Sequence, residues 1–261
     1  MQQLTIDGIR FRVVVEGAAD APALMLSNSL SSNLSMWDPQ MPEFLKRYRV
    51  VRYDHRGHGG TDAPAGPYSM ERLAQDAVDI LDALGIARAH WCGLSMGGMT
   101  GMWMLTHHSE RIDRAVLANT AAYMGPPELW QGRIQTATEG GMAALVDGTI
   151  ERWFTPEFRE RDPETIARVR AMILATPAQG YMGCCGAIRD MDQREAIRDI
   201  ASPALVIIGA KDPATTPEAG AVLTDAIKGS QSLTLDAAHL SNLEQPDAFT
   251  KAVVAFLENG R

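Results

Sequence analysis

Residues 91–98 read WCGLSMGG, and this stretch constrains the fold more than any other part of the chain. The segment RAHWCGLS is typical of a buried strand, and the segment MGGMTGMWMLTHH that follows has the apolar content of a helix. The pattern Gly-x-Ser-x-Gly at such a junction predicts a sharp turn that lifts Ser95 above the end of the sheet. A Cβ at Gly93 or Gly97 would crowd this turn. We therefore expect Ser95 to be a nucleophile rather than an incidental serine in a glycine-rich turn.

Strands and helices alternate along most of the chain. LTIDG and RFRVVVEG flank the dipeptide at positions 7–8, which predicts a β-hairpin. Ser69 is placed to begin a helix that runs to Leu84, and a final helix is expected from about residue 240 to residue 257. Further strands are predicted in the segments ALMLSN, YRVVRYD, IDRAVLANT, PALVIIGA and SQSLTLDA. This pattern predicts an α/β fold with a mostly parallel central sheet and helices on both faces.

Residues 120–195 break the alternation. They contain helical patterns separated by Pro and Gly, without a convincing strand. A helical insertion between two strands of an α/β sheet is placed to cover the carboxyl ends of the strands, where ligands bind in such folds. We therefore predict an α/β-hydrolase-like core made of residues 1–119 and 196–261, with residues 120–195 forming an inserted helical cap.

Charge and cysteine usage limit the class of protein. The 32 acidic and 24 basic residues give a net charge of −8, which argues against binding to nucleic acid or to an anionic membrane. The N-terminal segment does not resemble a signal peptide, and no window approaches the ~18 consecutive apolar residues of a membrane helix. Cys92, Cys184 and Cys185 are interpreted as small buried hydrophobic residues rather than a disulfide framework. We expect a cytoplasmic protein. The sequence does not indicate a protein partner.

A nucleophilic serine needs a base, and the base needs an orienting carboxylate. His239 lies in DAAHLSN, after the last predicted strand and on the side of the sheet that holds Ser95. Asp212, in GAKDPATTP, follows the preceding strand on the same side. Asp236 is the alternative acid, but it would have to orient a near neighbour from the same loop. We therefore predict Ser95, Asp212 and His239 as the catalytic residues. Structural roles are plausible for the other histidines, which are His55, His58, His90, His107 and His108.

Motifs for metals and cofactors are missing from the sequence. It has no His-Glu-x-x-His, no Cys-x-x-Cys, no Gly-x-Gly-x-x-Gly and no P-loop. Ester hydrolysis by a serine, a histidine and an aspartate needs neither, so we expect no metal and no cofactor.

These features resemble the α/β-hydrolase superfamily over nearly the whole chain, including its Ser, Asp, His order. The segment DHRGHG resembles the Asp-x-Arg-Gly-x-Gly loop of that superfamily, at Asp54, Arg56, Gly57 and Gly59, where its role is mainly to hold the loop. A narrower resemblance is to the 3-oxoadipate enol-lactonases of the bacterial protocatechuate (β-ketoadipate) branch of aromatic degradation. It rests on segments of core and cap alike: SNSLSSNLSMWDPQ, CGLSMGGM, NTAAYMG, GGMAAL, ERWFTP, GCCGAIRDMD, GAKDPATTP and AAHLSNLEQP.

The resemblance implies an oxyanion hole. One donor is the backbone N–H of Met96, directly after the nucleophile. The second comes from the loop after the third strand, where the superfamily usually has His-Gly-x and this chain has Asn28-Ser29-Leu30. We expect the N–H of Leu30 to be this donor, with Ser29 as a further contributor. Losing one such donor typically costs ~3–4 kcal/mol of transition-state stabilisation.

The resemblance also implies a small anionic lactone as substrate, with an acetate side chain, and therefore a cation or several amide donors in the pocket. The cap offers arginines and no lysine. We choose Arg133, because it lies close to Trp130 near the start of the cap. Trp130, Trp153 and Met142 are expected as apolar walls, although core packing explains each of them equally well. The other arginines considered are Arg152, Arg168, Arg170 and Arg189.

The expected function is therefore hydrolysis of 3-oxoadipate enol-lactone to 3-oxoadipate through an acyl-serine intermediate. Other hydrolases with a cap use the same three residues, so a carboxylesterase, a carbon–carbon bond hydrolase or a cofactor-free perhydrolase remains the alternative. A haloalkane dehalogenase would need Asp at position 95. A ligand-binding protein without activity would lack one of the three residues, and all three are present.

Overall fold

The structure is a computed structural model that describes residues 2–259. Its centre is one sheet of eight strands. The strands are β1 (Gln2–Ile6), β2 (Ile9–Glu16), β3 (Ala23–Ser27), β4 (Arg49–Tyr53), β5 (Ala89–Leu94), β6 (Ile112–Ala118), β7 (Ala204–Gly209) and β8 (Gln231–Leu235). They lie in the order β1-β2-β4-β3-β5-β6-β7-β8. The pairs β1–β2 and β2–β4 are antiparallel and the others are parallel, so the predicted α/β fold is confirmed.

The predicted hairpin is formed by β1 and β2, whose ends pair at Ile6 and Ile9. The two residues of its turn, Asp7 and Gly8, have φ values of 49° and 78°. Left-handed backbone at both central positions matches the right-handed twist of the strands that the turn connects.

Helices fill the connections between strands. α2 (Met70–Ala83) begins where Ser69 Oγ accepts the N–H of Arg72, as the sequence predicted. The predicted final helix is instead two helices, α10 (Ser241–Glu244) and α11 (Pro246–Glu258), because Pro246 cannot donate the N–H that would continue the first. The other helices outside residues 120–195 are η1 (Leu34–Gln40), α1 (Met41–Phe44), α3 (Met96–His107), η2 (Ser109–Arg111), η4 (Ala196–Asp199) and α9 (Pro217–Ala226).

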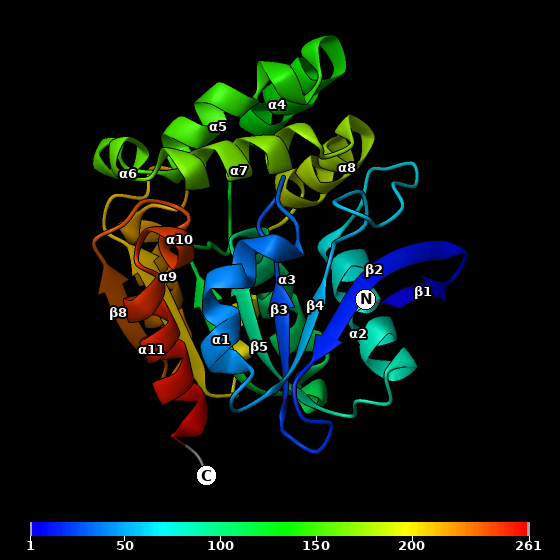
Figure 1. Cartoon of the computed structure of the whole chain (residues 1–261), viewed down its shortest axis with the longest axis vertical. Helices are drawn as coiled ribbons and strands as arrows, with labels where there is room; N and C mark the ends of the chain where they lie inside the picture. Colours follow the sequence, from blue (N-terminus) through cyan, green and yellow to red (C-terminus); the bar gives the residue numbers. More distant parts are fainter. Residues whose placement is uncertain (1, 260–261) are drawn as a thin grey trace.

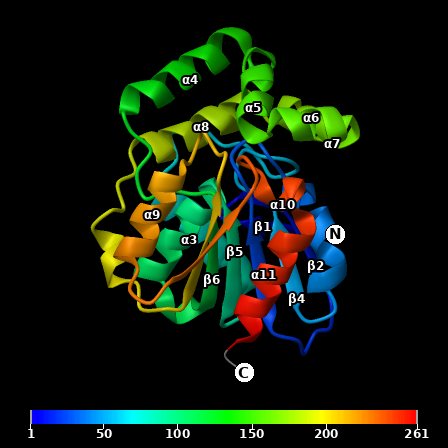
Figure 2. The ribbon, with the colours of Figure 1, turned by 90° about the vertical axis from the view of Figure 1, so that its left-hand side faces the viewer.

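The sheet lies between two layers of helices (Figures 1 and 2). α2, α3 and α9 contact one another or the strands on one face, and α11 packs with η1 and with β6 and β8 on the other. The central strand β5 is buried along its whole length. Its carboxyl end, where Ser95 follows, therefore lies near the middle of the upper edge of the sheet.

Residues between β6 and β7 form helices above this upper edge (Figure 1). The first and last residues of this segment lie next to each other. The N–H of Gln193 donates to Ala122 O over 2.8 Å, and Tyr123 forms a β-bridge with Asp192. The division of the chain into a core and a cap at residues 120 and 195 stays our interpretation, and "cap" denotes these residues below. The helices of the cap are α4 (Pro127–Gly140), η3 (Met142–Ala144), α5 (Val146–Trp153), α6 (Pro156–Arg161), α7 (Pro163–Leu174) and α8 (Ala178–Arg189).

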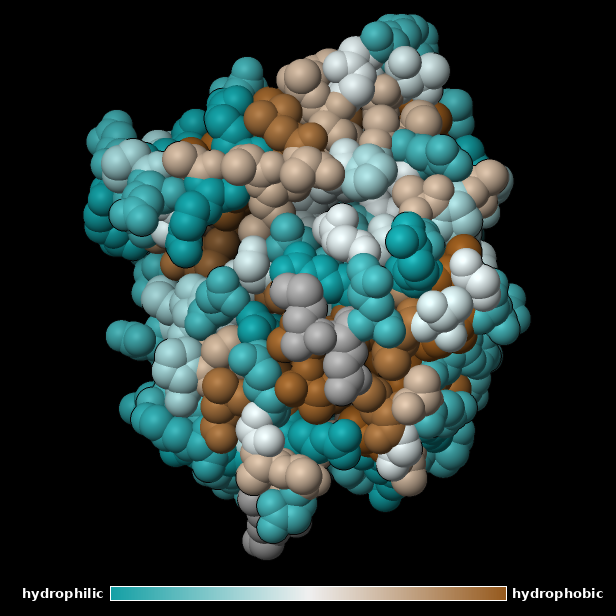
Figure 3. All heavy atoms as spheres, turned by 45° about the vertical axis from the view of Figure 1, so that its right-hand side comes forward, coloured by the Kyte–Doolittle hydropathy of each residue, from teal (hydrophilic) through white to brown (hydrophobic). Residues whose placement is uncertain are grey.

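The surface mixes polar and apolar side chains. Figure 3 shows teal and brown residues interspersed on the side of the hairpin. The exposed large hydrophobic residues among those described are Tyr123, Leu129, Leu174 and Val222, and the first three belong to the cap. Among residues 2–259 no helix has both the length and the apolar content to cross a membrane.

Candidate active site

Ser95 occupies the strained turn that the sequence predicted between β5 and α3. Its φ and ψ are 58° and −117°, a conformation that non-glycine residues rarely adopt. Three hydrogen bonds hold the residue there: its N–H donates to Ala118 O (2.9 Å), and its carbonyl accepts from Met99 N–H (2.9 Å) and Thr120 Oγ1 (2.8 Å). Its side chain lines a pocket beneath the cap.

The two glycines of the pattern leave space for backbone that a side chain would displace. A Cβ at Gly93 would collide with the carbonyl of Gly97, and a Cβ at Gly97 would collide with the carbonyl of Ser27. The second contact brings the first turn of α3 against the loop that follows β3. The missing side chain of Gly97 therefore allows the turn that holds Ser95 to contact the loop expected to supply the oxyanion donor.

His239 and Asp212 lie on neighbouring loops after β8 and β7, as expected from the sequence. His239 Nδ1 and Asp212 Oδ2 are 2.8 Å apart, and both side chains are buried. The contact leaves Nε2 of the imidazole as the atom that can serve Ser95. The described part of the chain shows no hydrogen bond between Ser95 and His239, and in ligand-free hydrolases this contact often tightens only with substrate bound. Both residues line the same pocket.

Asp212 is held as an ionised carboxylate by several donors. Its Oδ1 accepts the N–H groups of Ala214 (2.8 Å) and Thr215 (3.0 Å). Its Oδ2 accepts Thr215 Oγ1 (2.6 Å) and Asn119 Nδ2 (3.0 Å) in addition to His239. Burial acts to raise the pKa of Asp212, but its electrostatic interaction with His239 and these hydrogen bonds outweigh it and lower the pKa to about 2.

The loop after β3 presents free donors to the pocket. Within residues 2–259 the N–H of Leu30 has no acceptor in the protein, and Leu30 lines the pocket. Ser29 lines it too, and its hydroxyl is buried without a hydrogen-bond partner in the described chain. Met96 is the first residue of α3, and the first N–H groups of a helix have no intrahelical acceptor. The donors expected at Met96 and Leu30 are thus available.

The segment DHRGHG supports this loop from behind. The N–H of Ser31 donates to His58 Nε2 over 3.0 Å, so His58 carries its proton on Nδ1, which donates to Arg56 O over 3.2 Å. Burial lowers the pKa of His58 to about 4, and therefore the imidazole stays neutral and can accept this bond. Asp54 accepts the N–H of Leu34 over 2.7 Å. These contacts agree with a structural role for the segment.

The pocket collects most of the expected binding residues and omits one. Trp130, Arg133 and Trp153 line it, whereas Met142 is buried but does not line it. The ring centroids of Trp153 and His239 are 6.2 Å apart. The further lining residues are Ser31, Met99, Met124, Thr149, Arg152, Tyr181, Ile188, Ala214 and Thr215.

Two guanidinium groups share this pocket. Arg133 stacks over Trp130 at 4.5 Å, and Arg152 donates to Thr149 Oγ1 over 3.3 Å. Neither forms an ion pair with a carboxylate among residues 2–259. Burial, and then the charge of Arg133, lowers the pKa of Arg152. Two half-buried cations without a counter-ion favour an anionic ligand between them. Of the other arginines considered, Arg170 and Arg189 pair with Asp147 and Asp190.

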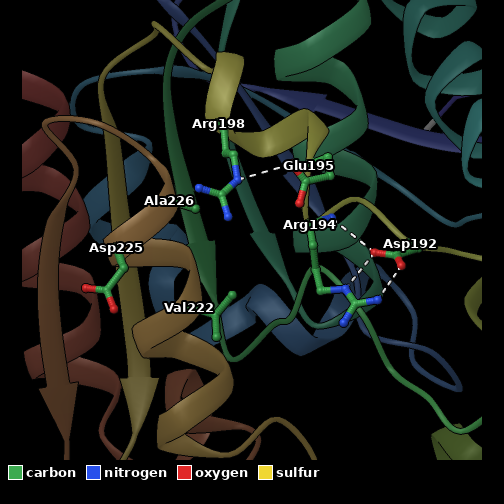
Figure 4. A pocket seen from close by; sticks show the side chains of 7 residues that line it. All are labelled: Asp192, Arg194, Glu195, Arg198, Val222, Asp225 and Ala226. Atoms are coloured by element: carbon green, nitrogen blue, oxygen red, sulfur yellow. Dashed lines mark hydrogen bonds and ion pairs between the residues drawn. The ribbon is translucent and has the colours of Figure 1, made fainter.

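A larger hollow of about 620 Å³ lies elsewhere, between η4 and α9 (Figure 4). Four of its charged side chains form two ion pairs, Arg194 with Asp192 at 2.6 Å and Arg198 with Glu195 at 3.5 Å. It contains none of the residues expected from the sequence. Among residues 2–259 no cluster of His, Cys, Asp and Glu is arranged to hold a metal ion. The pocket at Ser95 is therefore the candidate site.

The sequence analysis missed the residues that hold Asp212 and most of the further lining residues of the pocket, of which Tyr181 is one. Asn119 and Thr215 hold Asp212, and Tyr181 reaches the pocket from α8. Asn119 directly follows β6 and has a φ of 43°, so a polar residue at a strand end was the available signal. Thr215 lies three residues after Asp212, within reach of its carboxylate. Nothing in the sequence marks Tyr181.

Comparison with known proteins gives three findings. The family described as alpha/beta hydrolase fold matches residues 22–246. A 3-oxoadipate enol-lactonase of Acinetobacter baylyi is 42% identical over 98% of this chain and 96% of its own length. The crystal structure of the enol-lactonase from Burkholderia xenovorans LB400 has a TM-score of 0.97 and 45% identity, covering 98% of this chain and 99% of that one. A thermophilic esterase from Thermogutta terrifontis is similar at a TM-score of 0.92 and 25% identity, over 98% and 96% of the two chains.

Proposed function

Because the chain belongs to the α/β-hydrolase fold family and is an enzyme that hydrolyses esters, we propose that its substrate is 3-oxoadipate enol-lactone. The product is 3-oxoadipate, a step in the degradation of aromatic compounds by the protocatechuate (β-ketoadipate) route. The two enol-lactonases that match at 42% and 45% identity support this choice, because they match over the cap as well as the sheet.

We assign the first half of the reaction to Ser95, His239 and Asp212. Ser95 Oγ attacks the lactone carbonyl while Nε2 of His239 takes the hydroxyl proton. Asp212 holds the imidazole through Nδ1 and stabilises the imidazolium that forms. The negative charge on the carbonyl oxygen is stabilised by the N–H groups of Met96 and Leu30, with the Ser29 hydroxyl as a further donor.

The second half releases the product. When the tetrahedral intermediate collapses, the bond between the acyl carbon and the ring oxygen breaks, and His239 returns its proton to the leaving enolate oxygen. The enol formed tautomerises to the ketone. His239 then takes a proton from water as this water attacks the acyl group, and it gives the proton back to Ser95 Oγ. No cofactor takes part in these steps.

The single observation that carries the choice of substrate is the pair Arg133 and Arg152. These guanidinium groups lie in the pocket of Ser95 without a carboxylate partner in the described chain, so an anionic substrate supplies the missing charge. The lactone carbonyl then faces Ser95 and the acetate arm faces the cap. A neutral ester leaves both cations unpaired, which disfavours a general carboxylesterase. The free space in the pocket is about 40 Å³, enough for a few waters.

The alternative is another cap-bearing serine hydrolase, since the esterase from Thermogutta terrifontis has the same fold. The enol-lactone and its methyl ester separate the two. They offer the same lactone carbonyl, but only the first carries the acetate charge. We expect kcat/KM for the acid to exceed that for the methyl ester by roughly 10- to 100-fold, which is the effect of one or two charged hydrogen bonds. Equal values, or a preference for the methyl ester, would rule out the anionic substrate.

A further inference from the structure

Glu244 is a buried carboxylate at the end of α10 that the catalytic scheme does not use. Its side chain is 4% exposed. One oxygen, Oε1, accepts the N–H of Thr155 over 2.5 Å, and the other, Oε2, accepts the N–H of Ala238 over 3.0 Å. Both of these donors belong to the backbone, and both lie in segments that border the pocket.

The two donors come from parts of the chain that must be aligned for catalysis. Ala238 directly precedes His239, the proposed base. Thr155 belongs to the cap and lies two residues after Trp153, whose ring is beside the imidazole. A third bond, from the N–H of Leu240 to Trp153 O over 3.1 Å, joins the same two segments. The carboxylate of Glu244 is therefore the side-chain link between the loop of the base and the cap wall.

We propose that Glu244 is a positioning residue. It fixes the position of His239 relative to Trp153, which lines the pocket from the cap. Only a carboxylate suits this place, because it offers an acceptor oxygen to each N–H, whereas a glutamine amide would turn its own NH₂ toward one of them. The inference rests on the proposed roles of Ser95 and His239, and it does not depend on which ester is the substrate.

Labelling of Ser95 by diisopropyl fluorophosphate tests the inference without the natural substrate. Ser95 Oγ displaces fluoride from phosphorus while His239 accepts the proton, so the rate of fluoride release measures how well the two residues are aligned. In Glu244→Gln we expect labelling to be roughly 10- to 100-fold slower, the effect of a displacement near the reacting atoms. Glu244→Asp keeps both acceptor oxygens and should recover part of the rate. Asp236→Asn is the control, because Asp236 is an exposed carboxylate near the same loop that pairs with Lys211.

A second pair of variants removes the cap-side bond alone. Thr155→Pro lacks the donating N–H, and the native φ of −62° is one that proline adopts. Thr155→Ala keeps the N–H but loses the side chain that caps α6, as the proline variant also does. We expect Thr155→Pro to be labelled roughly 10-fold more slowly than Thr155→Ala.

The outcomes separate this inference from the proposed function. Wild-type enzyme that is not labelled at Ser95 overturns the assigned nucleophile and base, and the role of Glu244 with them. Two other results would overturn the role of Glu244 and leave the assigned nucleophile and base intact. The first is a labelling rate in Glu244→Gln that equals the wild-type rate. The second is a labelling rate in Thr155→Pro that equals the rate in Thr155→Ala. A residue with only a structural role would lower the melting temperature of Glu244→Gln without changing the labelling rate of the folded protein.

Discussion

Asn119 Nδ2 donates to Asp212 Oδ2 over 3.0 Å and, from the same amide, to Ala238 O over 3.1 Å. Its Oδ1 accepts the hydroxyl of Ser241 over 2.6 Å. One side chain directly after β6 thus joins the loop of the acid to the loop of the base. Its φ of 43° fits asparagine, which tolerates left-handed backbone better than most residues.

Asn119→Asp should reduce kcat by roughly 10- to 100-fold with a smaller change in KM, because a second carboxylate would face Asp212 and push the acid out of line with His239. Steady-state kinetics on the enol-lactone measure this. Asn119→Gly is the matched control for the backbone, since glycine accepts the left-handed φ without adding a charge. A kcat in Asn119→Gly that equals the wild-type value would show that the contact with Asp212 is not needed. A kcat in Asn119→Asp that equals the value in Asn119→Gly would show that the added charge has no effect of its own.

Arg152→Met and Arg133→Met should each raise KM for the enol-lactone by roughly 10-fold, because each removes one charged donor to the acetate. Neither change should reduce the turnover of an uncharged ester such as p-nitrophenyl acetate. Arg170→Met, which removes an exposed arginine of the cap paired with Asp147, is the control. An unchanged KM in both pocket variants would show that the acetate binds elsewhere.

Two buried histidines should each lower the free energy of unfolding as the pH decreases from about 6.5 toward 4. Burial is the largest cause that lowers the pKa of His55 to about 3 and of His58 to about 4, from 6.5. The unfolded chain binds protons at these residues over that range and the folded chain does not, so protonation favours unfolding. Each histidine contributes about 2 to 3 kcal/mol by a pH of roughly 4.5.

Urea unfolding at several pH values measures this slope, and His58→Gln should make it shallower. Asp212 adds a further loss only at lower pH: its folded pKa of about 2 is below the unfolded value of 3.8, so its contribution is present above about 4 and disappears toward 2. Burial raises the pKa of Asp54, Asp76 and Glu244, and these carboxylates oppose the histidines as the pH falls. The comparison between proteins is therefore decisive: a pH dependence in His58→Gln that equals that of the wild type would contradict the neutral state of His58.

Gly97→Ala should abolish most of the activity, because the new Cβ would collide with the carbonyl of Ser27 and separate α3 from the oxyanion loop. The matched control is Gly132→Ala in α4, where the space around the new Cβ is open and alanine favours the helix by about 1 kcal/mol. Activity and melting temperature of the two proteins give the comparison. An active Gly97→Ala enzyme would mean that the loop can retreat without losing Leu30 as a donor.

The arrangement of strands and the places of Ser95, Asp212 and His239 could be predicted because each depends on local pattern. Ser95 is marked by a strand-to-helix junction with flanking glycines. Asp212 and His239 are marked as polar residues that follow shortly after strands. In a parallel sheet these ends share one edge, so three distant segments can be placed together without any knowledge of their contacts.

The pocket could be predicted only in part, because its walls depend on how the cap helices pack. Arg133 and Arg152 lie on different helices, α4 and α5, and only the tertiary arrangement of the cap brings both to one pocket. Met142 has the same apolar character as the wall residues and is buried like them, but it does not line the pocket. The proposed role of Glu244 could not be predicted from the sequence either, because it depends on two backbone donors that lie 89 and 6 residues away in the chain.

The central claim is that Ser95 opens an anionic enol-lactone in this pocket. Its most direct test compares the wild type with Ser95→Ala on the enol-lactone and on p-nitrophenyl acetate. We predict that the wild type hydrolyses the enol-lactone far faster than the ester, and that Ser95→Ala loses roughly 10⁴-fold or more of the lactonase rate. Efficient turnover of the ester with almost none of the enol-lactone would contradict the substrate, and a Ser95→Ala protein that keeps its lactonase rate would contradict the nucleophile.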